Sequence, residues 1–520
     1  MNVQEIQKIC SEEKVILDKD LFENVSSINN PLFLKALLEK LKSLSGRSFI
    51  TNSFLEKNKK EIKFFLDNSS FENLLDKKNF YKLFDFSLDQ TPKKEKKTQK
   101  RSSVKILSPF HSSGKKIVVK DFVTHFRNRY KEMKSILEER KELENLVSIN
   151  KLSRDKQKFS IIGLVYSKKV TKNKNIILEV EDLTGKMKVL VSSSKEDLVK
   201  ESEDIPLDSV IGFKGVGNSD ILFVNEIVFP EVHLPERKKG DSEEIALFIG
   251  DLHYGSKKFL KKDFLRFIDY LNGKVPNTPE IKKIKYLFIV GDLVTGVGNY
   301  PNQEEDLEIQ DLEKQFEEIA KILSTIKKEI TIILSPGNHD GVRLMEPQPL
   351  LDEKFAWPLF EIENLILTEN PCILKIGESA SFEGFEVLTY HGFSFPYYSN
   401  SIPKLMIEKT MNQPEKIMKY LLKMRHLAPT HASTQYFPLE KDGLLIRKSP
   451  DIFVSGHTHK SGVSYLNNVL VISVSSWEGK TAYQEKFGNE PDHGKVISFN
   501  LKTRAVKVLD FETKEEENEN

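Results

Sequence analysis

The C-terminal half of the chain repeats one pattern, an apolar run that ends abruptly in a polar turn containing glycine. The first run, Leu247-Phe248-Ile249, stops at Gly250-Asp251-Leu252-His253. Such a run is typical of a strand buried on both faces, and its polar end lies where open α/β sheets bind ligands. Four further runs end at Asp292, at Asn338-His339, at His391 and at His457-Thr458-His459. Helix-period stretches at 259–271 and 307–326 separate the first three runs, as βαβ crossovers require. The pattern therefore predicts a sheet with polar side chains along one edge.

The periodicity is different in the first 236 residues. Residues 1–86 place apolar residues at helical spacing and predict a small helical N-terminal domain. Residues 87–118 are basic and low in complexity, which predicts a flexible linker, with a DNA-contacting arm as the alternative. A helix at 119–150 follows.

Residues 157–236 have the period of strands. Five strands with a helical interruption near 195–200 predict a five-stranded OB-fold barrel. Such barrels bind single-stranded nucleic acid or another protein, and the sequence does not choose between these. Phe159, Tyr166 and Phe213 are expected in the barrel core. We thus predict a multidomain α+β chain, with an α/β sandwich at 244–511 and an acidic tail at 512–520.

Composition narrows the classes of protein that remain. A chain of 520 residues is too long to fold around one ordinary hydrophobic core, so two or three domains are expected. Its 79 Lys and Arg and 77 Asp and Glu give a net charge of +2, so nucleic acid would have to bind at local patches. No apolar run approaches the ~18 residues of a membrane span, and the start lacks the features of a signal peptide. We expect a cytoplasmic protein without a membrane partner, in which Cys10 and Cys372 are packing residues.

Five of the 11 histidines fall at the predicted strand ends. Together with carboxylates and one carboxamide they provide seven candidate metal ligands: Asp251, His253, Asp292, Asn338, His391, His457 and His459. Singly, each is more often a hydrogen-bonded strand-end residue, but five such places in order favour a metal site. Asp292 is the natural bridge, because one carboxylate can hold two cations ~4 Å apart.

The donor set also indicates which cations to expect. Its mixed carboxylate, carboxamide and imidazole groups suit two divalent ions, Mn²⁺ first, with Fe²⁺, Zn²⁺ or Mg²⁺ as alternatives. Such a pair suits hydrolysis of a phosphoester. His339 is not needed as a ligand, and we predict that it acts as general acid, oriented by Asp340.

With these motifs in place, residues 244–511 resemble the calcineurin-like metallophosphoesterases. The resemblance covers about half of the chain. An OB-like barrel directly before this domain is similar to the arrangement in B-subunits of replicative DNA polymerases. The nearest resemblance is to the small subunit of archaeal D-family DNA polymerase, a 3′–5′ exonuclease, and residues 341–349 and 421–429 support it. One departure is His431-Ala432, where the family would have a Tyr-Gly pair.

The resemblance implies a division of the ligands between two ions. Asp251, His253 and His459 would surround one ion, Asn338, His391 and His457 the other, and Asp292 would bridge them. It also implies a heterodimer with a large catalytic subunit, and proofreading of single-stranded or mismatched DNA 3′ ends at the nucleoid.

Several points stay open at this stage. A sliding clamp is a further candidate partner, although no clamp-binding motif is evident. No substrate-binding residue is assigned, and Arg343 and Lys460 are the basic candidates near the cleft. Two alternative functions remain: a non-catalytic assembly subunit of the polymerase that retains the site, and a free-standing phosphoesterase.

Overall fold

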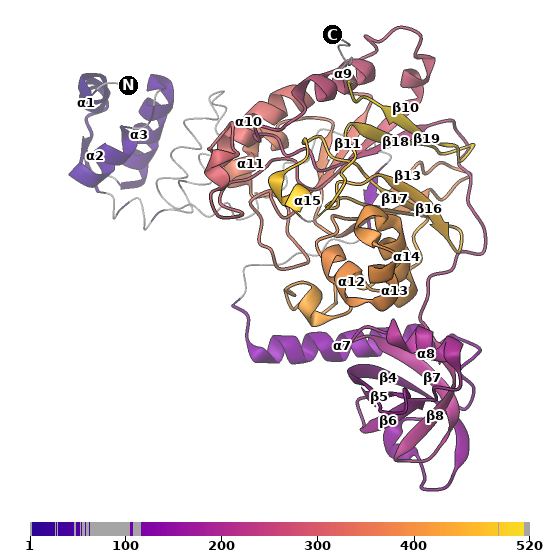
Figure 1. Ribbon diagram of the computed structural model, residues 1–520. Coiled ribbons are helices and arrows are strands. Elements are labelled where there is room, and N and C mark those ends of the chain that lie inside the picture. Colours follow the sequence, from indigo (N-terminus) through magenta and orange to yellow (C-terminus); the bar gives the residue numbers. More distant parts are fainter. Residues whose placement is uncertain are drawn as a thin grey trace. The chain divides into compact units, whose positions relative to one another are not determined.

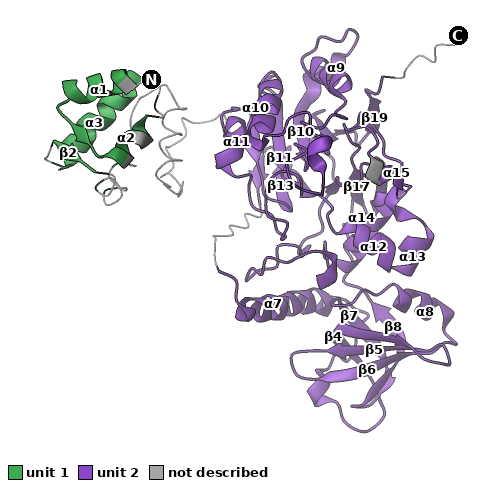
Figure 2. Cartoon of the chain, turned by 60° about the vertical axis from the view of Figure 1, so that its left-hand side comes forward, with its two compact units in different colours: residues 1–101 green, residues 102–520 purple. Residues whose placement is uncertain are grey.

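The computed structural model describes residues 3–26, 28, 30–45, 48–51, 54, 58, 62, 104–107, 116–486 and 488–513. The chain forms two compact units, residues 1–101 and 102–520 (Figures 1 and 2). Among the described helices, none combines the length and the apolar character that a membrane crossing requires.

The described part of the first unit contains three helices, α1 (Val3–Glu12), α2 (Lys19–Val25) and α3 (Pro31–Ser45). Asn30 caps α3, because its side-chain oxygen accepts the backbone N–H groups of Leu32 and Phe33, and Pro31 suits the first helical turn. Leu34, Leu37, Leu38 and Leu41 form the buried stripe of this helix. Two short strands, β1 (Ile16–Leu17) and β2 (Phe49–Ile50), pair in parallel. The rest of the helical domain predicted at 1–86 lies outside the described residues.

The stretch predicted as a linker contains a short strand. Within residues 104–107, β3 (Lys105–Ile106) pairs with β13 (Cys372–Ile376) in antiparallel fashion. The Leu107 N–H also donates to the Ile373 carbonyl at 2.8 Å. This part of the predicted linker therefore belongs to a sheet, while residues 87–103 and 108–115 lie outside the described part.

The helix predicted at 119–150 is shorter in the structure. Helix α7 spans Val119–Glu138 and starts with the Val118 N–H donating to the Asp121 carboxylate at 2.9 Å. It ends twelve residues early because Leu143 turns back to pack against the barrel at Gly212, where a Cβ would meet the Leu143 side chain at 2.8 Å. A short 3₁₀ helix, η1 (Ile149–Lys151), leads into the barrel.

The barrel has five strands and is closed, in the order β4-β5-β6-β8-β7. Its elements are β4 (Gln157–Val170), β5 (Ile176–Glu181), β6 (Lys186–Val191), α8 (Glu196–Glu203), β7 (Val210–Gly217) and β8 (Ile221–Val228). Phe159 and Phe213 are buried in it, as predicted. Tyr166 is only half-buried, with the Lys186 ammonium 4.3 Å from its ring centre.

Two six-stranded sheets follow. The first has the order β12-β11-β10-β9-β18-β19, and its four strands β12 to β9 run parallel. The second has the order β16-β17-β15-β14-β13-β3, with β14, β15 and β17 parallel. The first comprises β9 (Ile245–Ile249), β10 (Ile284–Val290), β11 (Thr331–Ser335), β12 (Leu365–Leu367), β18 (Lys495–Asn500) and β19 (Val506–Asp510). The second adds β14 (Phe385–Tyr390), β15 (Ile452–Ser455), β16 (Gly462–Leu466) and β17 (Val469–Ser473) to β3 and β13.

The sheets pack face to face and helices cover their outer faces. Phe248 and Phe288 stack at 4.9 Å in the core between the sheets, which Val387 and Val454 enter from the second sheet. On the first sheet lie α9 (Lys261–Leu271), α10 (Leu312–Leu323) and α11 (Glu353–Phe360). On the second lie α12 (Phe395–Ser401), α13 (Pro403–Ile407) and α14 (Pro414–Met424), which also adjoin the barrel (Figure 1). The remaining short helices are η2 (Pro279–Lys283), η3 (Gln303–Glu305), η4 (Thr410–Asn412), η5 (His431–Ser433) and α15 (Ala482–Lys486).

The described chain is thus mixed α/β with a closed five-stranded barrel, in agreement with the predicted class.

Candidate metal centre

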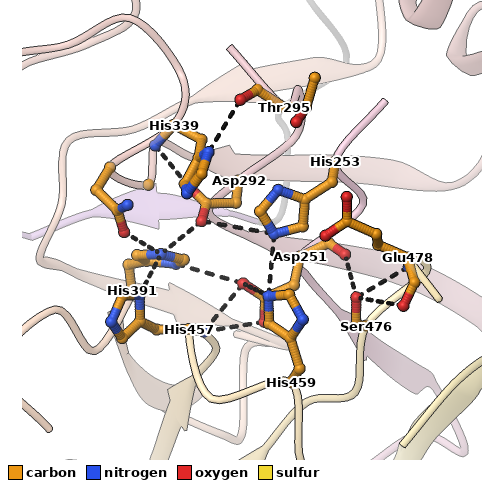
Figure 3. Close-up of polar contacts among 12 residues, drawn as sticks. Asp251, His253, Asp292, Thr295, His339, His391, His457, His459, Ser476 and Glu478 are labelled. Atoms are coloured by element: carbon orange, nitrogen blue, oxygen red, sulfur yellow. Dashed lines mark hydrogen bonds and ion pairs between the residues drawn. The ribbon is translucent and has the colours of Figure 1, made fainter. Parts of the chain in front are cut away.

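The carboxyl ends of five buried strands meet where the two sheets adjoin. β9, β10 and β11 end at one edge of the first sheet, and β14 and β15 end at the corresponding edge of the second. The seven side chains predicted as ligands lie just beyond these ends. Those of Asp251, His253, Asp292, His391, His457 and His459 point toward one another (Figure 3). The loops are bonded directly together, because both carboxylate oxygens of Asp251 lie within 3.0 Å of the His457 N–H.

Left-handed backbone conformations hold most of these side chains in place. The ligand positions with positive φ are Asp251 (48°), His253 (50°), Asp292 (48°), His457 (70°) and His459 (57°). Residues other than glycine rarely adopt this region, and such strain clusters at functional sites. The close approach of the loops also requires Gly291, because a Cβ there would lie 2.1 Å from His391 Nδ1.

The donor atoms converge in two overlapping groups. In the first, His253 Nε2 and His459 Nε2 lie 3.0 Å apart, with Asp251 within ligand range. In the second, His391 Nε2 lies 3.0 Å from Asn338 Oδ1, 3.2 Å from Asp292 Oδ2 and 3.3 Å from His457 Nδ1. Asp292 also reaches the first group, since its Oδ2 is 3.7 Å from His253 Nε2. This placement is the one expected of a bridging carboxylate.

Burial governs the protonation of the imidazoles. It lowers the pKa of His253 to about 3, and it lowers the pKa of His457 and of His459 well below the usual range. These rings are therefore neutral near pH 7, the form in which histidine ligates metals. Burial also opposes a charge on His391, but the carboxylates of Asp292 and Asp251 outweigh it and raise the pKa of His391 to about 10. The negative charge of these carboxylates thus favours a bound cation, either a proton or a metal ion.

The residues fit a pair of divalent cations on these grounds. His391 Nδ1 lies 3.3 Å from the Val290 carbonyl, so that it can donate there and leave the Nε2 lone pair facing the oxygens of Asn338 and Asp292. His253 Nδ1 is buried and has no hydrogen-bond partner in the described part of the chain. Oxygen and nitrogen lone pairs gathered this closely are the arrangement that a metal site requires.

His339 lies beside the first group. Its ring offers a nitrogen within 4.8 Å of donor atoms of His253 and Asp292, and its backbone N–H donates to Asp292 Oδ1 at 2.8 Å. The ring is held by the Thr295 carbonyl, 2.9 Å from Nδ1. The prediction that Asp340 orients this ring is wrong, because the Asp340 carboxylate instead accepts the backbone N–H groups of Val294 and Gly337. Asp340 therefore ties the loops after β10 and β11 together.

The other residues considered from the sequence are engaged within the protein. The Arg343 guanidinium donates to the Met345 and Pro347 carbonyls and lies 3.7 Å from the centre of the Phe437 ring. Lys460 pairs with Asp492 at 2.8 Å.

His431, where the sequence departs from the Tyr-Gly pair expected of the family, lies at the edge of α7. Its exposed ring contacts Phe122 and Phe126 of that helix edge-on. This position therefore lies against the helix that precedes the barrel.

Sequence reasoning missed three buried amides next to the ligands. Asn370 accepts the His391 N–H at 2.8 Å, Gln348 bonds to Asn370, and Gln484 Nε2 lies 2.8 Å from His459 Nδ1. Gln348 lies in an irregular segment, Gln484 in the short helix α15, and Asn370 three residues beyond the short strand β12, so none of them directly follows a long apolar run as the predicted ligands do.

Comparison with known proteins identifies the family. A sequence model of the DNA polymerase alpha/epsilon B-subunits matches residues 246–464, a range that contains all seven predicted ligands. The DNA polymerase II small subunit of Pyrococcus furiosus is 36% identical over 423 residues, which are 79% of this chain and 67% of that protein. That of Methanothermobacter thermautotrophicus is 33% identical over 395 residues, 75% of this chain and 79% of its own. The chain belongs to the archaeal DNA polymerase II small subunit family.

Membership in this small-subunit family confirms the resemblance inferred from the motifs. The matched region spans only about two thirds of the Pyrococcus furiosus small subunit. Among solved structures, an archaeal phosphodiesterase overlaps 51% of this chain and 98% of its own at 14% identity, with a TM-score of 0.25.

Proposed function

We propose that this small-subunit family member is a metal-dependent 3′–5′ exonuclease that hydrolyses phosphodiesters at DNA 3′ ends within a heterodimeric replicative polymerase. The observation that carries the proposal is the convergence of all seven predicted ligands, five of them at backbone positions with positive φ. An assembly subunit without catalysis would have no need of such strain. The calcineurin-like form of the two-sheet domain is part of the same proposal.

Two cations would be held by the two groups of donors, with Asp292 between them. When bound, divalent ions such as Mn²⁺ supply a nucleophile by lowering the pKa of bound water, and they neutralise the oxygens of the scissile phosphate. Fe²⁺, Zn²⁺ and Mg²⁺ are the alternatives. The neutral rings of His253, His457 and His459 and the carboxamide of Asn338 would complete the ligation without adding negative charge.

The reaction would also need a proton for the leaving oxygen. We assign that proton to His339, whose Nδ1 faces the Thr295 carbonyl and whose other ring nitrogen is then free to serve the 3′ oxygen. The Thr295 carbonyl, 2.9 Å from Nδ1, and the Asn299 amide, 3.1 Å from the same nitrogen, hold the ring in position. Cleavage of the bond between phosphorus and the 3′ oxygen releases a deoxynucleoside 5′-monophosphate.

The partners follow from the family and are equally proposals. A large catalytic subunit would supply the polymerase, and a frayed or mismatched primer end would reach this site as a single strand. The chain would then act at the nucleoid, with a sliding clamp as a further candidate partner. The barrel would contact the large subunit or the single strand.

A nuclease assay on the purified full chain tests the proposal. With Mn²⁺ and a labelled single strand, the wild type should release mononucleotides from the 3′ end. Chelation should abolish release, and His457→Ala should reduce it by at least ~100-fold, since even residues outside the ligand set cost 10–100-fold. His233→Ala, at an exposed histidine remote in sequence from the motifs, is the matched control and should keep full activity.

Two results would refute the exonuclease. One is digestion that His457→Ala leaves unchanged. The other is an inactive wild type combined with an Asp292→Ala variant that leaves proofreading by the complete polymerase unaltered. The second result would favour the assembly subunit.

A further inference from the structure

Two buried glutamines flank the ligands without belonging to them. Gln348 is 2% exposed and follows the β11 loop, and Gln484 is 9% exposed and lies in α15. Glutamine is seldom fully buried unless its amide is bonded. The bonds of these two amides lead to different groups of ligands.

Gln348 connects two ligand loops through Asn370. Their backbones pair, with N···O distances of 2.6 and 3.1 Å, and Asn370 Nδ2 donates to Gln348 Oε1 at 2.6 Å. Gln348 Nε2 then lies 3.4 Å from the carbonyl of Gly337, which precedes the ligand Asn338. Asn370 Oδ1 accepts the backbone N–H of His391 at 2.8 Å. The amide pair therefore sets the separation between the loop of Asn338 and the loop of His391.

Gln484 acts on the other group. Its Nε2 lies 2.8 Å from His459 Nδ1, and its Oε1 accepts the Thr481 N–H at 2.9 Å. An amide can present either nitrogen or oxygen to an imidazole. In either orientation this contact fixes the ring of His459, whose Nε2 faces His253.

We propose that each metal position has its own positioning glutamine. Gln348, through Asn370, sets the affinity of the position formed by Asn338, His391 and His457. Gln484 sets the affinity of the position formed by Asp251, His253 and His459. This inference rests on the two-ion centre of the proposed function but does not require nuclease activity.

The expected size of the effect follows from comparable metal sites. Removing a hydrogen bond that orients a ligand typically lowers metal affinity by ~10–100-fold. Leucine has nearly the volume of glutamine and removes every side-chain hydrogen bond. Gln348→Leu and Gln484→Leu should therefore each weaken one Mn²⁺ by ~10–100-fold and leave the other within ~3-fold.

The experiment is a Mn²⁺ titration of the full chain followed by electron paramagnetic resonance. The wild type should bind two ions and give the spectrum of an exchange-coupled pair. Each leucine variant, at Mn²⁺ concentrations that saturate only the stronger position, should give the spectrum of an isolated ion. Adding His253→Ala to Gln348→Leu should remove the remaining ion, whereas adding Asn338→Ala should not. The pattern should reverse for Gln484→Leu.

Gln315→Leu is the matched control. Gln315 is also fully buried, but it bonds to the backbone of Gly296 and of Ile309. Its replacement should lower stability without changing either Mn²⁺ affinity. If Gln348→Leu fails to fold by circular dichroism, Gln348→Glu keeps the oxygen that accepts from Asn370, removes the donor to Gly337 and should show the same selectivity.

Equal weakening of both ions by either variant, or no weakening, would overturn the proposal. A wild type that binds a single Mn²⁺ would also overturn it, whatever the nuclease assay shows. A wild type that binds two ions but digests no DNA would instead refute only the proposed function.

Discussion

The sharpest test of the loop geometry is Gly337→Ala. Gly337 is buried directly before Asn338, and its φ lies outside the left-handed region, so the backbone itself tolerates alanine. The space does not, because the new Cβ would lie 2.2 Å from Asp292 Oδ1 and 2.4 Å from the Asp292 backbone nitrogen. The substitution therefore displaces the carboxylate proposed to bridge the two ions, without replacing any of the proposed ligands.

The magnitude follows from that overlap. Real Cβ atoms essentially never approach other atoms closer than 3.0 Å. The Asp292 carboxylate must then retreat by nearly 1 Å, and a misplacement of about 1 Å can cost ~10²-fold in rate. Overpacking of this kind also lowers the free energy of unfolding by about 1–3 kcal/mol.

The assay measures the rate of 3′-end digestion at saturating Mn²⁺, together with a Mn²⁺ titration and a thermal melt. Gly337→Ala should lose ~10²-fold in rate while remaining folded at the assay temperature. Gly479→Ala is the matched control in a loop beside the site, because its Cβ would meet the Lys258 carbonyl at an ordinary 3.6 Å. A Gly337→Ala enzyme with a rate within threefold of wild type would refute the close approach of these loops.

Two stability predictions concern buried ionisable side chains that are not among the proposed ligands. Arg129 and Asp442 form a fully buried pair between α7 and the loop after α14, so Arg129→Met should lower the free energy of unfolding by about 3–5 kcal/mol in urea; a loss below 1 kcal/mol would contradict this. Burial raises the pKa of Glu346 to about 7, so the stability that its protonation contributes is complete below about pH 4.5 and is lost as the pH rises through about 7. Glu346→Gln should flatten that decline, measured as the free energy of unfolding at pH 5 and pH 8, and a variant that keeps the wild-type slope would count against it.

The convergence of the seven proposed ligands could be predicted because each follows an apolar run. An apolar run followed by Gly-Asp or Gly-His is readable in a few residues, and parallel strands bring such ends to one edge. The left-handed positions at Asp251 and Asp292 are invisible in the sequence, since aspartate gives no sign of its φ angle. These φ angles are fixed by the packing of the loops at the ends of the two sheets.

The features that could not be predicted depend on contacts distant in sequence. Asn370 and Gln484 reach His391 and His459 from segments distant in sequence, after β12 and in α15, so only the folded chain shows their role. Helix α7 ends at Glu138, although the charged sequence typical of its surface continues beyond that residue. The chain turns there because Leu143 packs against the barrel. Lys105 and Ile106 become a strand because the edge of β13 offers them hydrogen-bond partners.

The five proposed ligands with left-handed backbone conformations affect how the site tolerates substitution during evolution. Each costs on the order of 1–3 kcal/mol of folding free energy, which the cores around the two sheets must offset. Glycine or asparagine at these positions would reduce this cost. Substitutions selected for stability alone would therefore replace the proposed ligands first. The fold can therefore persist after the proposed ligands are lost, and a homologue with the same fold would then have no catalytic activity.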